Sequence, residues 1–169
     1  HKEKQSYQQG NIKHMMLAIE SGMSGSEEAV RFLQSEILAQ ELKSVHFLDL
    51  NIDEISYKQP TQIAAMEWLV TLYQEIASTP PSIDSSSIDI IKAGLSKYNG
   101  VLGRPLINSA ALERVETLDL VQEYNAQVVV TAAGREGMPS NAVERVQNAM
   151  IMIEEARKRN IGLSDIFVD

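Results

Sequence analysis

Short apolar runs that end in a polar residue alternate with longer amphipathic stretches along this chain. The pattern predicts strands at VHFLDLN (45–51), PSID (81–84), PLIN (105–108), QVVVT (127–131) and DIFVD (165–169). The runs are nearly all apolar, which is typical of parallel strands covered on both faces. Helical stretches between them supply the right-handed crossovers that parallel strands need. The sequence therefore predicts an α/β protein with a parallel sheet.

Apolar residues spaced three or four apart predict the intervening helices. One helix is expected to begin at Pro60 and to bury Tyr73, and another to begin after Pro139 and to end near Asn160. Upstream, Gly22 is predicted to end a short helix before a further one begins at Ser24 or Ser26. The packed face predicted for the helix after Pro139 consists of Val143, Val146, Ala149, Met150, Ile153 and Ala156.

Two architectures satisfy this order of elements, a doubly wound sheet and a (β/α)8 TIM barrel. No G-x-G-x-x-G or G-x-x-x-x-G-K-[ST] motif follows a strand, so phosphate-binding doubly wound folds lose their usual signature. In a barrel, residues at the carboxyl ends of the strands form the active site. The strand ends here are polar throughout: Asp49, Asn51, Asp84, Asn108, Thr131 and Asp169. We therefore predict a TIM barrel.

A complete barrel has eight strands in about 250 residues, whereas this chain of 169 residues supplies about five βα units. No linker or internal repeat divides the sequence. We expect residues 1–169 to form a single domain, a partial barrel that is incomplete at both ends. Such a domain would be part of a longer protein or would pair with another chain to close its sheet.

Composition excludes several kinds of partner and chemistry. The net charge of −8 argues against nucleic acid and anionic membranes as partners, and no apolar run is long enough to span a bilayer. The absence of cysteine excludes disulfides, thiolate metal sites and cysteine nucleophiles, and the three histidines show no metal-ligand spacing. These features, with no signal-peptide pattern, predict a cytoplasmic protein without a metal site.

The polar strand ends suggest a flat ligand rich in N–H groups. A carboxylate such as Asp84 accepts two parallel hydrogen bonds, and its matched partners are planar N–H forks such as a guanidinium or the aminopyrimidinone edge of a pterin. The alternative is that these side chains only cap helices or turns. On that interpretation Asp84 caps the following helix. Independently of it, we expect Ser86 to act through capping, and Asp53 and Glu54 to be solvated loop charges.

Six segments resemble the pterin-binding methyltransferases in their order along the chain, from about Ser24 to Asp169: FLDLNID, AAMEWLVTLYQEIA, PSIDSSSIDIIKAGL, PLINSAALER, GREGMPSNAVERV and IGLSDIFVD. The resemblance is closest to methyltetrahydrofolate:corrinoid-protein methyltransferases and to the folate-binding module of cobalamin-dependent methionine synthase. It implies a TIM barrel in which Asp84, Asn108 and Asp169 hold the pterin. Asp49 and Asn51 then belong to the pterin hydrogen-bond network and are the candidate catalytic residues.

The resemblance implies methyl transfer between N5 of tetrahydrofolate and the cobalt of a corrinoid (cobalamin) carried by a partner protein. Methyltetrahydrofolate is then a substrate, and the protein is expected to form a homodimer. The family's first strand and its last two, one of which supplies an asparagine to N5, have no counterpart in this sequence. Two alternatives remain, a dihydropteroate synthase with the same pterin contacts and a non-catalytic folate-binding module.

Overall fold

Five parallel strands form one sheet in a computed structural model that describes residues 13–135 and 137–169. The strands lie side by side in chain order, which confirms the predicted parallel sheet. Their bounds are β1 (Leu48–Asn51), β2 (Pro81–Asp84), β3 (Leu106–Ala110), β4 (Gln127–Val130) and β5 (Ile166–Val168).

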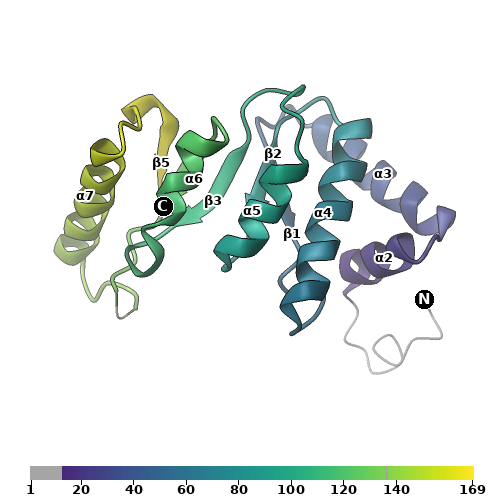
Figure 1. Cartoon of the computed structure of the whole chain (residues 1–169), viewed down its shortest axis with the longest axis horizontal. Coiled ribbons are helices and arrows are strands. Elements are labelled where there is room, and N and C mark those ends of the chain that lie inside the picture. Colours follow the sequence, from purple (N-terminus) through teal and green to yellow (C-terminus); the bar gives the residue numbers. More distant parts are fainter. Residues whose placement is uncertain (1–12, 136) are drawn as a thin grey trace.

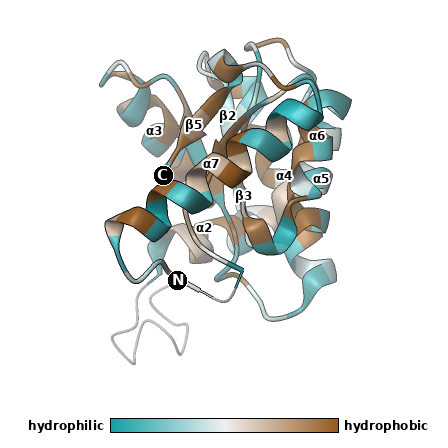
Figure 2. Ribbon diagram, turned by 90° about the vertical axis from the view of Figure 1, so that its left-hand side faces the viewer, coloured by the Kyte–Doolittle hydropathy of each residue, from teal (hydrophilic) through white to brown (hydrophobic). Residues whose placement is uncertain are grey.

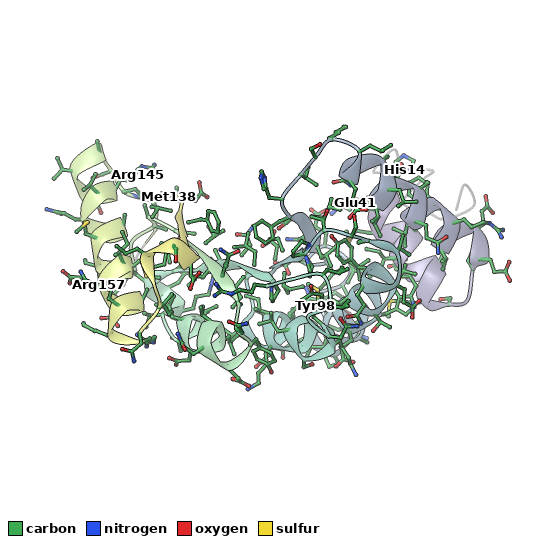
Figure 3. The ribbon with its side chains drawn as sticks, turned by 90° about the horizontal axis from the view of Figure 1, so that it is seen from above. His14, Glu41, Tyr98, Met138, Arg145 and Arg157 are labelled. Carbon is green, nitrogen blue, oxygen red and sulfur yellow. The ribbon has the colours of Figure 1, made fainter. Side chains whose placement is uncertain are left out.

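Helices alternate with the strands and cover the outer face of the sheet (Figure 1). Seen from above (Figure 3), His14 of α2 and Glu41 of α3 lie at one end of the molecule, and Arg145 and Arg157 of α7 lie at the other. The helices are α2 (His14–Met23), α3 (Glu27–Glu41), α4 (Gln59–Ile76), α5 (Ile88–Lys97), α6 (Thr117–Glu123) and α7 (Ala142–Lys158), with 3₁₀ turns η1 (Leu112–Arg114) and η2 (Leu163–Asp165).

The sheet curves strongly across its width. Phe47, just before β1, and Phe167 on β5 belong to opposite edges, yet their ring centroids lie 6.3 Å apart. Side chains of two edge strands meet in this way only when the sheet curls around its inner face, as the strands of a barrel do. The protein is therefore a partial (β/α) barrel.

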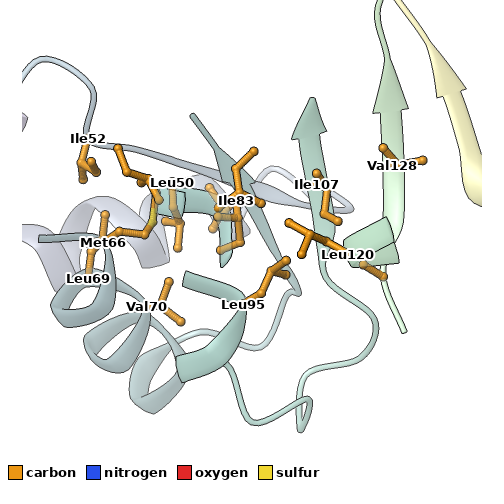
Figure 4. Packing of buried hydrophobic residues seen from close by; sticks show 14 of the residues in the cluster. Leu50, Ile52, Met66, Leu69, Val70, Ile83, Leu95, Ile107, Leu120 and Val128 are labelled. Carbon is orange, nitrogen blue, oxygen red and sulfur yellow. The ribbon is translucent and has the colours of Figure 1, made fainter. Parts of the chain in front are cut away.

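The core lies between the outer face of the sheet and the helices. Alternate strand residues point outward, and Ile83, Ile107 and Val128 are completely buried against the helices (Figure 4). Helix α5 approaches β2 closely at Gly94, where a Cβ atom would lie 2.9 Å from Cγ2 of Ile83. In Figure 2 strand β5 is largely hydrophobic, whereas hydrophilic and hydrophobic residues alternate along the helices. This outer packing leaves the inner face for polar side chains.

Of two predictions near the N-terminus, one is confirmed and one is wrong. Ser26 caps α3 as expected, since its side chain accepts a hydrogen bond from the N–H of Ala29. Gly22, however, is not the residue that ends its helix. It lies inside α2 against Trp68, where a Cβ would come within 2.5 Å of the indole ring, and the residue with positive φ after the helix is Gly25, at 90°. Close packing, and not chain reversal, requires glycine at position 22.

The packed face predicted for α7 is partly wrong. Of its members Ala156 is buried, but Val143, Val146 and Met150 are 67%, 62% and 53% exposed, and the other buried residues of the helix are Met152 and the polar Asn148. Asn148 is accepted there because its Nδ2 donates to the carbonyl oxygen of Ala132, 3.1 Å away. The side of α7 that carries Asn148, Met152 and Ala156 is therefore the side that is buried.

Candidate functional site

The inner face of the sheet carries a row of polar side chains at the carboxyl ends of β1, β2 and β3. Because Leu50 and Ile83 point outward to the helices, their neighbours Asn51 and Asp84 point inward. The register places Asn51 beside Asp84 and Asp84 beside Asn108. Two residues earlier on the same two strands, Asp49 lies beside Ser82. Four of the five site residues predicted from the sequence therefore meet on three adjacent strands.

Asn51 is bound directly to Asp84. Its Nδ2 donates to Oδ2 of Asp84 at 2.8 Å, and its Oδ1 accepts from the backbone N–H of Asp53 at 2.9 Å. The second bond fixes which end of the amide is the donor, since a carbonyl oxygen is needed toward Asp53. Asn51 is thus held with its N–H group aimed at the Asp84 carboxylate.

Asp49 occupies the centre of a second group. Its Oδ1 accepts from Ser82 Oγ at 2.7 Å and from Asn108 Nδ2 at 3.3 Å. Asp49 also lies close enough to Asp84 to share a side-chain hydrogen bond that raises the pKa of Asp84. Ser82 was not predicted as a site residue, although its place two residues before Asp84 puts it on the same face of β2. The two carboxylates are therefore neighbours, and each also has a neutral amide or hydroxyl partner.

Asp84 is poised to exchange a proton near neutral pH. Burial raises its pKa to about 6 from an ordinary value of 3.8, and the charges of Asp49 and Asp53 add to the rise. The hydrogen bond from Asn51 acts in the opposite direction. A carboxyl group with this pKa accepts hydrogen bonds when ionised and holds a proton over an accessible pH range.

The serines that follow β2 form a turn around Asp53. Ser85 Oγ donates to Oδ1 of Asp53 at 2.6 Å, while the N–H and Oγ of Ser86 donate to Oδ2 at 3.1 and 3.0 Å. Ser85 Oγ also accepts from the N–H of Ser87, 3.1 Å away. Asp53 therefore joins the loop after β1 to the loop after β2. Its interpretation as a solvated loop charge is wrong.

Neither Asp84 nor Ser86 caps α5, so both helix-capping predictions are wrong. The residue at the N-cap of α5 is Ser87, and in the described chain no side chain makes a capping hydrogen bond there. Asp84 binds Asn51 and Ser86 binds Asp53. The acid at the end of β2 therefore belongs to the inner face of the sheet, and not to the helix that follows.

Asp169 stands apart from this group. Its backbone continues the pairing of β5 with β4: its N–H donates to the carbonyl oxygen of Val130 at 3.1 Å, and its own carbonyl accepts from Ala132 at 2.7 Å. Strand β4 separates it from Asn108, and its nearest strand-end neighbour is Thr131. Phe167 meets Phe47 across the inner face, and alternation along the strand places Asp169, two residues later, on that same face.

The family model described as pterin binding enzyme matches residues 36–169. The chain is a member of the pterin-binding enzymes. It is 25% identical over 153 residues to the methylcorrinoid:tetrahydrofolate methyltransferase of Eubacterium limosum, covering 85% of this chain and 52% of that protein. It is 28% identical over 133 residues to the methionine synthase of Mycobacterium leprae (strain TN), covering 73% of this chain and 10% of that protein. The chain thus spans about half the length of the first relative and a tenth of the second.

This pterin-binding enzyme has a donor and acceptor set that fits a heterocycle better than a metal ion. In residues 13–135 and 137–169, no group of three or more acidic or histidine side chains is arranged to hold a metal. Two carboxylates that each keep a neutral hydrogen-bond partner can accept N–H groups, and the amide of Asn108 can both donate and accept.

The same two ranges of residues contain no helix with the length and apolarity of a membrane span.

Proposed function

We propose that this pterin-binding enzyme transfers a methyl group between N5 of tetrahydrofolate and the cobalt of a corrinoid carried by a partner protein. The observation that carries the proposal is the row formed by Asp49, Asn51, Asp84 and Asn108, whose side chains are joined in pairs across the ends of β1, β2 and β3. The names of the two relatives, one acting on a methylcorrinoid and tetrahydrofolate and one making methionine, support this reaction among those of the family.

Binding of the pterin is assigned to Asp84, Asn108 and Asp169. Ionised Asp84 accepts the two parallel N–H groups at the aminopyrimidinone edge, in the geometry in which a carboxylate binds a planar fork. Asn108 binds a part of the ring that presents both a donor and an acceptor. Asp169, which follows β5 on the inner face, accepts a further ring N–H. Asn51 holds the Asp84 carboxylate in position before the ligand arrives.

Asp49 and Asn51 are assigned to the chemistry at N5. A folate N5 leaves readily only when it gains positive character, through a proton or a strong hydrogen bond. Asp49, held by Ser82, can accept a hydrogen bond from a protonated N5 and so stabilise its positive charge. The corrinoid supplies the nucleophilic cobalt, so no side chain of this protein needs to form a covalent bond. The task of these residues is to position the pterin and to stabilise charge at N5.

The test is a direct transfer assay with the full-length protein. Methyltetrahydrofolate and cob(I)alamin are mixed with the protein, and methylcobalamin formation is followed by its visible absorbance. We expect transfer by the wild type and its loss in Asp84→Ala. Folate binding without transfer would instead indicate a non-catalytic module. Condensation of a pterin pyrophosphate with p-aminobenzoate would indicate a dihydropteroate synthase.

A further inference from the structure

The hydroxyl of Thr131 is buried without a hydrogen-bond partner among the described residues. Thr131 follows β4, and its N–H donates to the carbonyl oxygen of Ala110 at 3.0 Å, so its backbone remains in the sheet. The residue as a whole is partly exposed, which means that its accessible surface lies elsewhere than on Oγ1. A buried hydroxyl without a partner destabilises a fold, because it has lost its bonds to water.

The position of Thr131 is that of a site residue. Val128 and Val130 are completely buried against the helices, so alternation along the strand turns Val129 and Thr131 to the inner face. Strand pairing places Thr131 beside Asp169 and on the side of Asn108 that faces β5. Thr131 therefore fills the gap between the β1–β3 group and Asp169.

The sequence around Thr131 makes the hydroxyl notable. Three valines precede it in QVVVT, and valine has nearly the shape of threonine. A fourth valine would continue the strand and would leave no orphaned polar atom. A rotation of the side chain by about 120° exchanges the hydroxyl and the methyl group between staggered positions, so a ligand that offers the hydroxyl an acceptor can select another rotamer.

We infer that Thr131 is a further pterin-binding residue, whose hydroxyl donates to an acceptor atom of the ring next to the N–H group that Asp169 accepts. A carboxylate such as Asp169 only accepts when ionised, so an adjacent hydroxyl supplies the donor that an alternating ring edge needs. This inference rests on the proposed function, since it takes the pterin to be the ligand of the inner face.

The experiment compares Thr131→Val, Thr131→Ser and Thr117→Val in the full-length protein. Thr117 is the matched control, because it is a second threonine whose buried hydroxyl lacks a partner in the described structure, but it begins α6 outside the strand ends. Affinity is measured for methyltetrahydrofolate and for 6-methyltetrahydropterin, which lacks the folate tail. Melting temperature is measured without ligand.

For Thr131→Val we expect opposite signs in the two measurements. The affinity for both ligands falls about tenfold, the effect of one hydrogen bond of ~1.4 kcal/mol. The melting temperature rises by about 2–4 °C, because the orphaned hydroxyl is gone. Thr131→Ser binds within about threefold of the wild type, since it keeps the hydroxyl. Thr117→Val becomes more stable with unchanged affinity.

Several results would overturn the inference. If Thr131→Val bound both ligands as the wild type does, the hydroxyl would be only a buried orphan. If Thr131→Ser lost as much affinity as Thr131→Val, side-chain shape and not the hydroxyl would matter. A loss seen with the folate but not with 6-methyltetrahydropterin would move the contact from the ring to the tail. Failure of the wild type to bind either ligand would overturn the proposed function as well, and so differs from the other outcomes.

Discussion

The ring of Phe47 meets the ring of Phe167 edge to face, with their planes at 79°, across the inner face of the sheet. The two residues are on opposite edges of a five-stranded sheet. Their contact therefore depends on the curvature of the sheet, which brings β5, the strand before Asp169, close to the β1 edge. The pair is a structural link between the two halves of the candidate site.

Phe167→Ala should loosen this link. Phe167 is 44% exposed, so we expect a smaller loss than for a fully buried phenylalanine, about 1–2 kcal/mol in the free energy of unfolding from urea denaturation. Tyr57→Ala is the control, because Tyr57 is 92% exposed and its removal should change stability by less than about 0.5 kcal/mol. Equal losses in the two variants would argue against a packing role for the aromatic pair.

Asp84→Ala and Asn108→Ala should each weaken methyltetrahydrofolate binding by at least about 30-fold in the full-length protein. Removing one side of a charged, paired contact leaves the donors of the ring without partners, which costs roughly 2–5 kcal/mol, at ~1.4 kcal/mol per tenfold change. Calorimetric titration measures the change. Asp89→Ala is a matched control on α5, where Asp89 accepts a bond from Gln59 away from the inner face. Unchanged affinity in Asp84→Ala would remove Asp84 from the pterin site.

The pKa of Asp84 predicts a pH-dependent stability. Its folded value of about 6 lies above its ordinary value of 3.8, chiefly because of burial, so the ionised carboxylate opposes folding. The folded state binds more protons than the unfolded state between these values, and the penalty therefore grows as pH rises from about 4 to about 6. Asp84→Asn should be more stable than the wild type at about pH 7.5, with a smaller advantage at about pH 5, in thermal unfolding. An advantage that is independent of pH would contradict the raised pKa.

Asp53→Ala should release the two loops beside the site. It removes an acceptor of three hydrogen bonds from Ser85 and Ser86, and the buried Ser85 hydroxyl loses the group to which it donates. We expect a loss of about 1–3 kcal/mol in urea denaturation. Glu54→Ala provides the comparison, because the ion pair of Glu54 with Lys13 is exposed and should contribute less than about 1 kcal/mol. A similar small change in both variants would mean that Asp53 is solvated.

Ser86→Ala should also act through Asp53, and not through capping of α5. It removes one of the two Ser86 bonds to the carboxylate and leaves the backbone N–H bond, so a loss of roughly 1 kcal/mol is expected. In the Asp53→Ala background the same substitution should have almost no further effect. Additive losses in this double-mutant cycle would show that Ser86 stabilises the fold by another route.

Much of the fold and site was determined by the sequence itself. PSID predicts a strand with Asp84 at its end, and that strand is found with the same bounds. Strand and helix periods are local properties of the chain, so short windows carry them. Parallel strands all present their carboxyl ends at one edge of the sheet, and this geometry gathers Asp49, Asn51 and Asn108 near Asp84 once the strands are known.

Only the tertiary structure decided which groups are bound to one another. Asn51 meets Asp84 across 33 residues of sequence, and Asp53 meets Ser86 across the same separation, because strand register and loop shape place them together. On α7, periodicity alone does not show that Asn148 and Met152 are buried while Val143 and Val146 are exposed, because this depends on where β4 lies beside the helix. Local patterns specify which elements form and which faces they possess, whereas contacts between distant residues depend on how those faces are arranged in space.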